Sequence, residues 1–239
     1  KTLVLGANGQ VGRALRAEYG DDPSFEFVNR EQVDLSGDLE SGLRWQDYDT
    51  VINAAAYTAV DDAETPGGRP DAWAVNVTGV AALARIATAR GLTVVHLSSD
   101  YVFDGTSETP YREDDPVAPL GVYGQTKAAG DQLVATVPRH YILRTSWVIG
   151  DGHNFVRTML SLAERGVDHP QIALGVEIDR GGNLEAVGDD LLRLRLAELA
   201  VGEERQPHAP HVGDVLAEGQ APVHGHVVHG QVAVELADQ

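Results

Sequence analysis

The chain of 239 residues is long enough to bury the core of one domain, or of one domain and a small second lobe. Its net charge of −18 argues against nucleic acid or an anionic membrane surface as a partner. The absence of cysteine excludes a disulfide framework and a thiolate metal site. Without a signal peptide or an apolar run of membrane-spanning length, a cytoplasmic location is expected.

A glycine-rich turn follows the first predicted strand, residues 2–5, and precedes a helix predicted over residues 13–19. Strand, glycine turn and helix are the context in which such a motif binds a dinucleotide. Gly6 permits a tight turn, Gly9 lets the backbone approach a pyrophosphate, and Gly12 lets the helix lie close to the strand. The spacing is GxxGxxG, and an ordinary βα turn is the alternative.

The second predicted strand, residues 25–28, ends at Asn29 and Arg30, where a dinucleotide fold meets the adenosine ribose. An acidic residue there holds a 2′-hydroxyl, whereas an arginine accommodates a 2′-phosphate. The neutral Asn29 beside Arg30 therefore favours NADP as the cofactor. The alternative is that Arg30 is only a solvated surface residue. Asp34 and Leu35 are expected where the adenine ring ends.

The ends of the next two predicted strands carry small or hydroxyl side chains. Residues 50–52 run into Ala54, Ala55 and Ala56, which leave room for a ligand at the carboxyl edge of an α/β sheet. Helices over 60–65 and 72–90 follow, and Asn76 inside the second is a poor helix former, so a buried hydrogen-bonding role is expected. The strand over 93–97 ends in two serines, which serve either as caps or as donors to a ligand.

Tyr123 stands four residues before Lys127, at the start of an alanine-rich helix predicted over residues 126–136. Positions i and i+4 share a helix face, so phenol and ammonium would point into one space. An ammonium roughly 4 Å away would lower a tyrosine pKa of about 10 by roughly three units. A phenol tuned toward neutral pH, a hydroxyl donor and a lysine form a carbonyl-reducing set. Solvated helix decoration is the alternative.

The alternation of strand and helix through residue 155 predicts an α/β fold with a doubly wound parallel sheet of the Rossmann type. Further elements are a strand over 141–144 and a helix over 154–164. Right-handed crossovers would collect the motifs at one edge of the sheet. We predict an NAD(P)-binding domain that carries the catalytic residues over 1–166, and an atypical C-terminal region over 167–239.

The C-terminal region differs in composition from the rest. The 3 Trp, 7 Tyr and 4 Phe all precede residue 156, and six of the 9 His fall between residues 169 and 229. No histidine spacing is typical of a metal site, so none is predicted. We expect a loosely packed tail with a helix over 189–201 and short strands within 224–236.

Seven motifs follow one another over residues 1 to about 166: GANGQVG (6–12), VDLSGD (33–38), NAAAYTAVDDAE (53–64), NVTG (76–79), SSDYVFDG (98–105), VYGQTK (122–127) and RTSWV (144–148). Together they resemble the extended short-chain dehydrogenase/reductases and, within them, the dTDP-4-dehydrorhamnose reductase family. After about residue 167 the chain departs from the aromatic-rich substrate lobe of that family.

The resemblance implies reduction of the C4 keto group of dTDP-4-dehydro-6-deoxy-L-mannose to dTDP-L-rhamnose, with NADPH or NADH as cofactor. It makes Ser99, Tyr123 and Lys127 catalytic, and places Ser99, Asp100 and Trp147 at the sugar. The implied cofactor-binding residues are Gly6, Asn8, Gly9, Gln10, Val11, Asn29, Arg30, Asp34, Leu35, Ala54, Ala55, Ala56, Thr58, Ser98, Tyr123 and Lys127.

Other functions share parts of this pattern. A sugar-nucleotide dehydratase needs an acidic pair after the serine, and here Tyr101 follows Asp100. Another nucleotide-sugar epimerase or reductase would keep the Tyr/Lys pair, and a non-catalytic NADP-binding regulatory protein of the same fold is the main alternative from another class. A homodimer, or a fusion or partnership with a 3,5-epimerase, are the assemblies considered; the chain begins at Lys1 without Met.

Overall fold

The computed structural model describes residues 1–107, 109–146 and 148, together with residues 157, 158, 161 and 165 and the backbone of 226–229. The chain divides into two units, residues 1–152 with 220–239, and residues 153–219. The fold below belongs to the first unit. The helices expected over 154–164 and 189–201 lie largely or wholly outside the described residues, as does Trp147.

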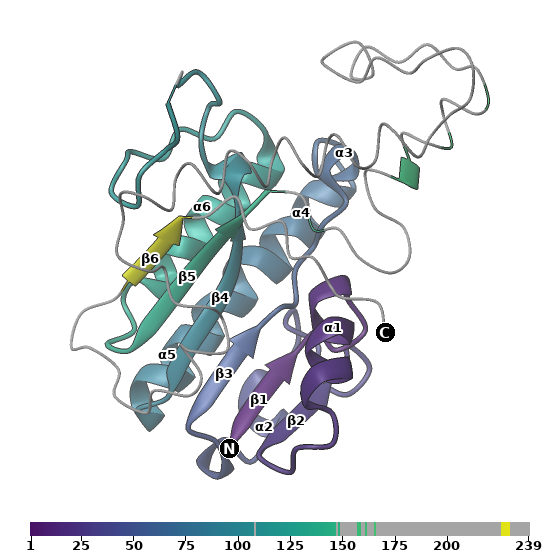
Figure 1. Cartoon of the computed structure of the whole chain (residues 1–239), viewed down its shortest axis with the longest axis vertical. Helices are drawn as coiled ribbons and strands as arrows, with labels where there is room; N and C mark the ends of the chain where they lie inside the picture. The colour runs from purple at the N-terminus through teal and green to yellow at the C-terminus, as the bar shows by residue number, and fades with distance from the viewer. Residues whose placement is uncertain are drawn as a thin grey trace. The chain divides into compact units, whose positions relative to one another are not determined.

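A six-stranded parallel sheet in the order β2-β1-β3-β4-β5-β6 forms the centre of the first unit (Figure 1). Its strands are β1 (Thr2–Leu5), β2 (Phe25–Val28), β3 (Thr50–Asn53), β4 (Thr93–Ser99), β5 (His140–Thr145) and β6 (His226–His229). The strand order changes direction between β1 and β3, so crossovers to either side lie on opposite faces and leave a crevice at the carboxyl ends. The predicted doubly wound α/β class is confirmed, and β6 supplies one of the strands expected in the tail.

The helices are α1 (Gln10–Tyr19), α2 (Leu39–Gly42), α3 (Val60–Ala63), α4 (Gly68–Trp73), α5 (Val80–Arg90) and α6 (Val122–Val134). Short 3-10 helices, η1 (Trp45–Asp47) and η3 (Asp100–Val102), and a π-helical segment, η2 (Ala74–Gly79), complete the described elements. Helix α6 begins four residues earlier than predicted, because its first turn is capped by a residue from another element. Both Tyr123 and Lys127 therefore lie inside it.

The stretch Gly68–Arg90 is continuous helix and is long and apolar enough to cross a membrane by length and composition. Its apolar side chains pack in the hydrophobic core of the protein. Val80, Leu83, Ile86 and Ala87 of α5 are buried in the core of the first unit. The helix is therefore apolar because it packs inside a globular fold.

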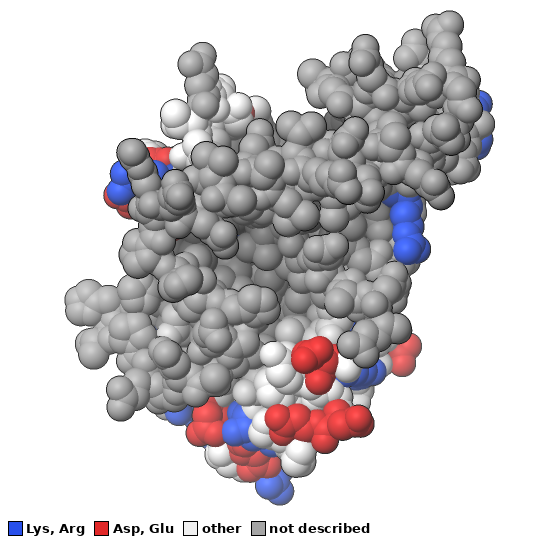
Figure 2. Space-filling view, viewed as in Figure 1, with Lys and Arg blue, Asp and Glu red and all other residues white. Residues whose placement is uncertain are grey.

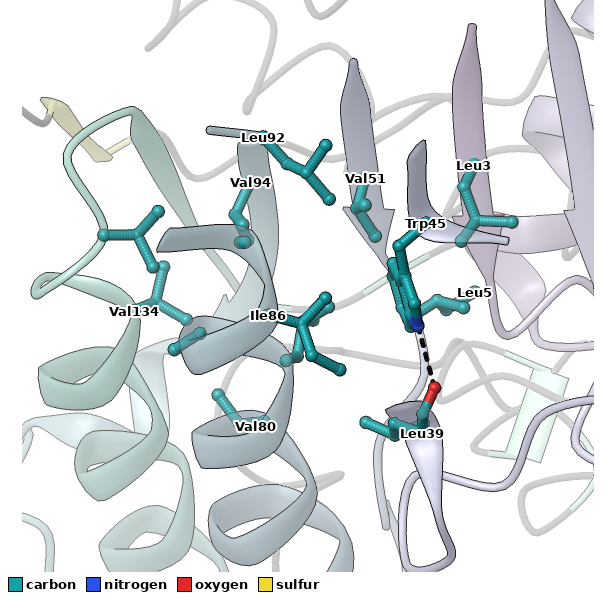
Figure 3. Close-up of a cluster of buried hydrophobic side chains, with 14 of the residues drawn as sticks. Leu3, Leu5, Leu39, Trp45, Val51, Val80, Ile86, Leu92, Val94 and Val134 are labelled. Carbon is teal, nitrogen blue, oxygen red and sulfur yellow. Dashed lines mark hydrogen bonds between the residues drawn. The ribbon is translucent and has the colours of Figure 1, made fainter. Parts of the chain in front are cut away.

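The main hydrophobic cluster fills the space between the sheet and α5 (Figure 3). Leu3 and Val51 from neighbouring strands and Ile86 of α5 belong to it, and Trp45 of η1 lies among them at 1% exposure. The Trp45 indole donates to the Leu39 carbonyl oxygen at 2.8 Å, which satisfies a polar group that burial would otherwise penalise. This packing fixes the strands whose carboxyl ends carry the candidate site.

Basic and acidic side chains are interspersed on the surface near the N terminus (Figure 2). Lys1 pairs through its side chain with Glu26 at 2.6 Å and through its amino group with Asp49 at 2.5 Å, while Arg44 pairs with Asp47 at 2.6 Å. Exposed pairs of this kind contribute about 0–1 kcal/mol each. This end of the sheet is a solvated surface, opposite to the edge where the motifs converge.

Candidate active site

The glycine turn begins where β1 ends. Gly6 has φ of 83°, in the left-handed region that favours glycine, and a Cβ there would lie 2.7 Å from the Ala55 backbone nitrogen. The amides of Gly6 and Ala7 donate to the Val28 carbonyl oxygen at 3.1 and 3.0 Å, which ties the turn to β2. A Cβ at Gly12 would lie 2.2 Å from the Gly6 oxygen, so α1 crosses directly over the turn.

The N-cap residue of helix α1 provides no side-chain cap. This residue is Gly9, and the first turn of the helix contains no acidic residue. The amides of a helix's first turn have no carbonyl partner within the helix, and together with the positive end of the helix dipole they favour an anion at this position. Asn8 and Gly9 are exposed, while Gln10 and Val11 are partly buried. This donor set fits a pyrophosphate, and its contacts with a cofactor stay a prediction.

The residues after β2 form a turn of their own. The Asn29 side-chain oxygen accepts from the amides of Glu31 and Gln32 at 3.0 and 3.1 Å. Arg30 is 78% exposed and its Nε lies 3.3 Å from Asp34 Oδ2. Hydrogen bonds from Ser36, first among several groups, lower the pKa of Asp34. Arg30 and Asp34 are therefore available at the surface where the ribose is expected.

Leu35 is predicted beside the adenine ring, but its side chain is directed into the hydrophobic core. Its side chain is 4% exposed and belongs to the main hydrophobic cluster. Its carbonyl oxygen approaches Gly79, where a Cβ would lie 2.3 Å away. Any contact between Leu35 and an adenine ring would thus come from its backbone.

The loop after β3 is tied by a hydrogen bond to the end of β1. The Ala54 amide donates to the Leu5 carbonyl oxygen at 3.1 Å, and Ala54, Ala55 and Ala56 are partly buried while Thr58 is exposed. Ala55 packs against the main hydrophobic cluster, and the predicted contacts of the three alanines with a ligand stay a prediction.

Asn76 connects this loop to α6. Its side chain accepts from the Tyr57 amide at 2.8 Å, donates to the Tyr57 carbonyl at 3.1 Å and donates to Thr126 Oγ1 at 3.0 Å. Asn76 is 2% exposed, so the expected buried hydrogen-bonding role is confirmed. It lies in the π-helical segment, a distortion often found at functional sites.

Ser99 and Tyr123 meet at the carboxyl end of β4. The Ser99 hydroxyl accepts from the Tyr101 amide at 3.2 Å and donates to Asp100 Oδ1 at 3.1 Å, so it does cap η3. It also interacts with the phenol. Burial is the largest effect and raises the pKa of Tyr123 to about 12, against a hydrogen bond with Ser99 that lowers it. Tyr101 packs edge-on to the Tyr123 ring at 5.6 Å.

Lys127 is buried at 2% exposure and donates from Nζ to the Leu97 carbonyl oxygen at 2.6 Å. Burial lowers the pKa of Lys127 to about 8, against a nearby Asp131 that raises it. The expectation that this ammonium brings the Tyr123 pKa close to neutral is wrong for this arrangement. The ammonium is directed at β4, and burial disfavours the phenolate. Tyr123 therefore keeps its proton across the physiological pH range, as a proton donor must.

The predicted sugar contacts are only partly placed. Asp100 is exposed as a residue, although neighbouring atoms crowd its carboxylate, and this desolvation raises the pKa of Asp100. It follows Ser99 at the same edge of the sheet. Trp147 lies outside the described residues. Ser99, Asp100 and Tyr123 thus lie together at the predicted reacting edge, with Ser98 buried nearby.

Several residues that support the site were not predicted from sequence. Glu64 accepts from the Val122 amide at 2.6 Å and so caps α6 just before Tyr123. Asn53 pairs with His96 at 3.0 Å, and Asp131 accepts from Arg144 Nε at 3.0 Å. Glu64 belongs to one of the matching motifs, but nothing local to it indicates a partner 58 residues away.

A separate cavity of about 470 Å³ opens between α6, β5 and an acidic loop. Its lining residues are Glu113, Asp114, Asp115, Pro116, Val117, Asp131, Gln132, Ala135, Ile142 and Arg144. Ser99 and Tyr123 are not among them, and the three consecutive acidic residues fit a nucleotide phosphate poorly. Among the described residues, no group of three or more His, Asp or Glu is arranged to hold a metal ion.

An all-parallel sheet with a glycine turn after β1 and a Ser–Tyr–Lys set beside β4 defines a Rossmann-type domain of the short-chain dehydrogenase/reductase class. Residues 1–173 match the family described as the RmlD substrate binding domain. The chain belongs to this family.

Named relatives agree with this assignment. The dTDP-4-dehydrorhamnose reductase of Sinorhizobium fredii is 45% identical over 168 residues, which cover 69% of this chain and 56% of that protein. The enzyme of the same name from Aggregatibacter actinomycetemcomitans is 39% identical over 211 residues, 85% of this chain and 69% of that protein. A solved dTDP-4-dehydrorhamnose reductase from Bacillus anthracis, in complex with NADP, superposes with a TM-score of 0.61 at 32% identity, over 69% of this chain and 59% of that one.

The lengths of these alignments indicate how far the similarity extends into the C-terminal region. The chain spans little more than half the length of the Sinorhizobium protein, and the family match ends at residue 173. Both agree with a resemblance that ends near residue 166. The alignment with the Aggregatibacter enzyme covers 85% of the chain and thus continues into the tail.

Proposed function

We propose that this chain is an NAD(P)H-dependent oxidoreductase that reduces the C4 keto group of dTDP-4-dehydro-6-deoxy-L-mannose to dTDP-L-rhamnose. The observation that carries the proposal is the placement of Ser99 and Tyr123 together at the carboxyl edge of the sheet, with Lys127 one helical turn beyond Tyr123. The names of the relatives and the NADP complex of the Bacillus enzyme support it.

The residues of the glycine turn would hold the cofactor, NADPH or NADH, which supplies a hydride to C4 when bound. The first-turn amides of α1 after Gly9 suit the pyrophosphate, and Arg30 suits a 2′-phosphate. Lys127 uses one of its three N–H donors on Leu97, so two remain for the nicotinamide ribose.

Proton transfer is the part of the reaction that this chain supplies. In the proposed mechanism Tyr123 donates its phenolic proton to the oxygen on C4 while the Ser99 hydroxyl hydrogen-bonds the same oxygen. A sugar alkoxide is more basic than a phenolate, so this transfer is downhill even with a Tyr123 pKa of about 12. The partly buried edge excludes part of the water that would weaken these hydrogen bonds.

The test is oxidation of NADPH or NADH by the full chain, with the dTDP-4-keto sugar made in situ and the product identified. Tyr123→Phe should lower kcat by about 100-fold or more, because a general acid contributes at least that much. Tyr19→Phe, which keeps its stacking on Phe25, is the matched control and should retain full activity. Absence of turnover with cofactor binding retained would favour a non-catalytic regulatory protein. A different product would favour another nucleotide-sugar reductase or epimerase.

The proposal also includes the domain boundaries, the oligomeric state and the cellular location. Residues 1–166 would form the NAD(P)-binding domain, and residues 167–239 would replace the usual substrate lobe. A homodimer or an association with a 3,5-epimerase, and a cytoplasmic location, also stay predictions. Light scattering of the purified chain, alone and mixed with the epimerase, would measure the first two.

A further inference from the structure

Three buried polar atoms beneath the reacting edge face one another without direct partners. They are His96 Nε2 and Ser98 Oγ of β4 and Asp131 Oδ1 of α6, and none has a hydrogen-bond partner among the described residues. The three residues are 1%, 5% and 1% exposed. His96 Nε2 lies 4.0 Å from Asp131 Oδ1, which is too long for a direct hydrogen bond. Such groups are rare in folded proteins, and a bound water is the usual reason for them.

The donors and acceptors in this group can be assigned. Asn53 Oδ1 accepts from the Ala55 amide at 3.2 Å, which turns the Asn53 amide nitrogen toward His96 Nδ1, 3.0 Å away. An amide nitrogen only donates, so Nδ1 accepts. Burial, followed by the charge of Lys127, lowers the pKa of His96 well below its usual range, so the ring is neutral. Its proton is therefore on Nε2 and points into the gap.

A water molecule fits the gap chemically. It would accept from His96 Nε2–H and donate to Asp131 Oδ1, with the Ser98 hydroxyl as third partner. A water about 2.8 Å from both atoms subtends an angle of about 90° across their separation, within the normal range for bridging water. Burial is the largest effect and raises the pKa of Asp131, against the nearby Ser98 hydroxyl, which lowers it, although no hydrogen bond of normal geometry joins the two. A Cβ at Gly130 would lie 3.7 Å from His96 Nε2, so glycine leaves that side of the ring nitrogen without a side-chain neighbour.

The gap adjoins Lys127. Asp131 lies one helical turn beyond it on the same face of α6, and Lys127 Nζ binds the carbonyl of Leu97, between His96 and Ser98. The charged and titratable groups packed here are Asp131 from α6, His96 from β4 and Arg144 from β5, which is paired with the second Asp131 oxygen.

We propose that His96, Ser98 and Asp131 enclose one ordered water, which holds Asp131 in place as the counterion of Lys127. Asp131 and His96 are then positioning residues for the lysine. The water site stands on its own geometry, and only its value for catalysis rests on the proposed function.

The sequence offers a direct probe, because Lys1 and Lys127 are its two lysines. With 13C at the lysine ε-carbon, NMR would show one signal from each, and exposed Lys1 serves as the internal reference. In the wild-type chain Lys127 should titrate with a pKa of about 8. Asp131→Asn should lower that midpoint by about one unit or more, because a buried ammonium loses its counterion.

His96→Leu tests the water itself. Removing the Nε2 donor should displace the water and lower the Lys127 midpoint by about half a unit, since Asp131 loses a hydrogen bond that favours its charged form. His140→Leu, at a buried histidine of the neighbouring strand, should leave the midpoint unchanged. If His96→Leu does not fold, Ser98→Ala should give a smaller shift in the same direction.

A crystal structure of the full chain at high resolution should show the water within hydrogen-bond distance of all three atoms. A dry gap, a direct His96–Asp131 hydrogen bond, or a Lys127 midpoint unchanged by the folded His96→Leu or Ser98→Ala variant would overturn the proposal. Neither experiment needs cofactor or sugar, so a failure here is distinct from a failure of the proposed reductase activity.

Discussion

The two halves of the candidate site differ in whether backbone or side-chain atoms form them. Around β1 and α1 the site is backbone: a left-handed Gly6, a helix that crosses it at Gly12, and the first-turn amides of α1 after Gly9. Around β4 and α6 it consists of buried polar side chains, among them Lys127 at 2% exposure and Asp131 at 1%. The part around β1 and α1 depends on close backbone contacts that only glycine permits. The part around β4 and α6 depends on buried polar groups that each need a hydrogen-bond partner.

The difference predicts how each half fails. In the backbone half, a Cβ added at Gly6 or Gly12 would collide with main chain, and polar changes on the surface matter little. In the side-chain half, removing one partner leaves another buried group unpaired. The four predictions below test this contrast.

Asn76→Ala should have the largest effect on stability. It leaves the partly buried amide and carbonyl of Tyr57 and the buried Thr126 hydroxyl without these partners, and each unsatisfied buried group costs about 1–3 kcal/mol. We expect a loss of about 3 kcal/mol in the free energy of unfolding, measured by urea denaturation. Asn8→Ala, at an exposed asparagine, should change it by less than about 0.5 kcal/mol. Equal effects of the two changes would contradict the buried role of Asn76.

Among single-methyl additions around β1 and α1, Gly12→Ala should lower stability and NADPH affinity most. The new Cβ would lie 2.2 Å from the Gly6 oxygen, so α1 has to move, at a cost of about 2 kcal/mol. NADPH affinity, measured by fluorescence titration, should fall with it. A Cβ at Gly42 would meet nothing within 4 Å, so Gly42→Ala is the matched control and should be tolerated. A stable Gly12→Ala variant with full affinity would show that the turn adapts.

Lys127 makes stability depend on pH. Its folded pKa of about 8 is below the ordinary 10.5, so between these values the unfolded chain binds more protons and stability rises with pH. The stability advantage of Lys127→Met over wild type should therefore be smaller at about pH 9.5 than at about pH 7, by about 2 kcal/mol. Denaturation at both pH values measures this.

The control for this prediction is the other lysine. Lys1→Met, at a partly exposed position, should show no such difference between the two pH values. A pH-independent Lys127→Met difference would mean that the buried ammonium is fully solvated or fully compensated. The raised pKa of Tyr123 acts only above about pH 10 and does not interfere.

Arg30→Ala should have the smallest effect, confined to coenzyme choice. Arg30 is 78% exposed, so stability should hardly change, but the affinity for NADPH relative to NADH should fall by about tenfold if its charge meets the 2′-phosphate. Arg44→Ala is the control, because Arg44 has the same exposure and a similar ion pair. Equal affinities for the two coenzymes in every variant would remove Arg30 from the site.

The sequence by itself determined the features that depend on neighbours in the chain. Strand and helix alternation, the glycine turn and the i, i+4 spacing of Tyr123 and Lys127 follow from local periodicity and the freedom of glycine, and most predicted elements lie within one or two residues of those found. The exceptions are informative. Helix α6 starts early because Glu64, far back in the chain, caps it.

The tertiary structure decided what depends on residues brought together from a distance. The Tyr123 pKa, the direction of the Lys127 ammonium, the Leu35 side chain in the core and the group formed by His96, Ser98 and Asp131 all result from packing between β4, α6 and their neighbours. Burial and hydrogen bonding set the charge of a group, and neither is encoded by the spacing of residues along the chain. The sequence therefore predicted which groups meet at the reacting edge, and the fold determined how they are charged.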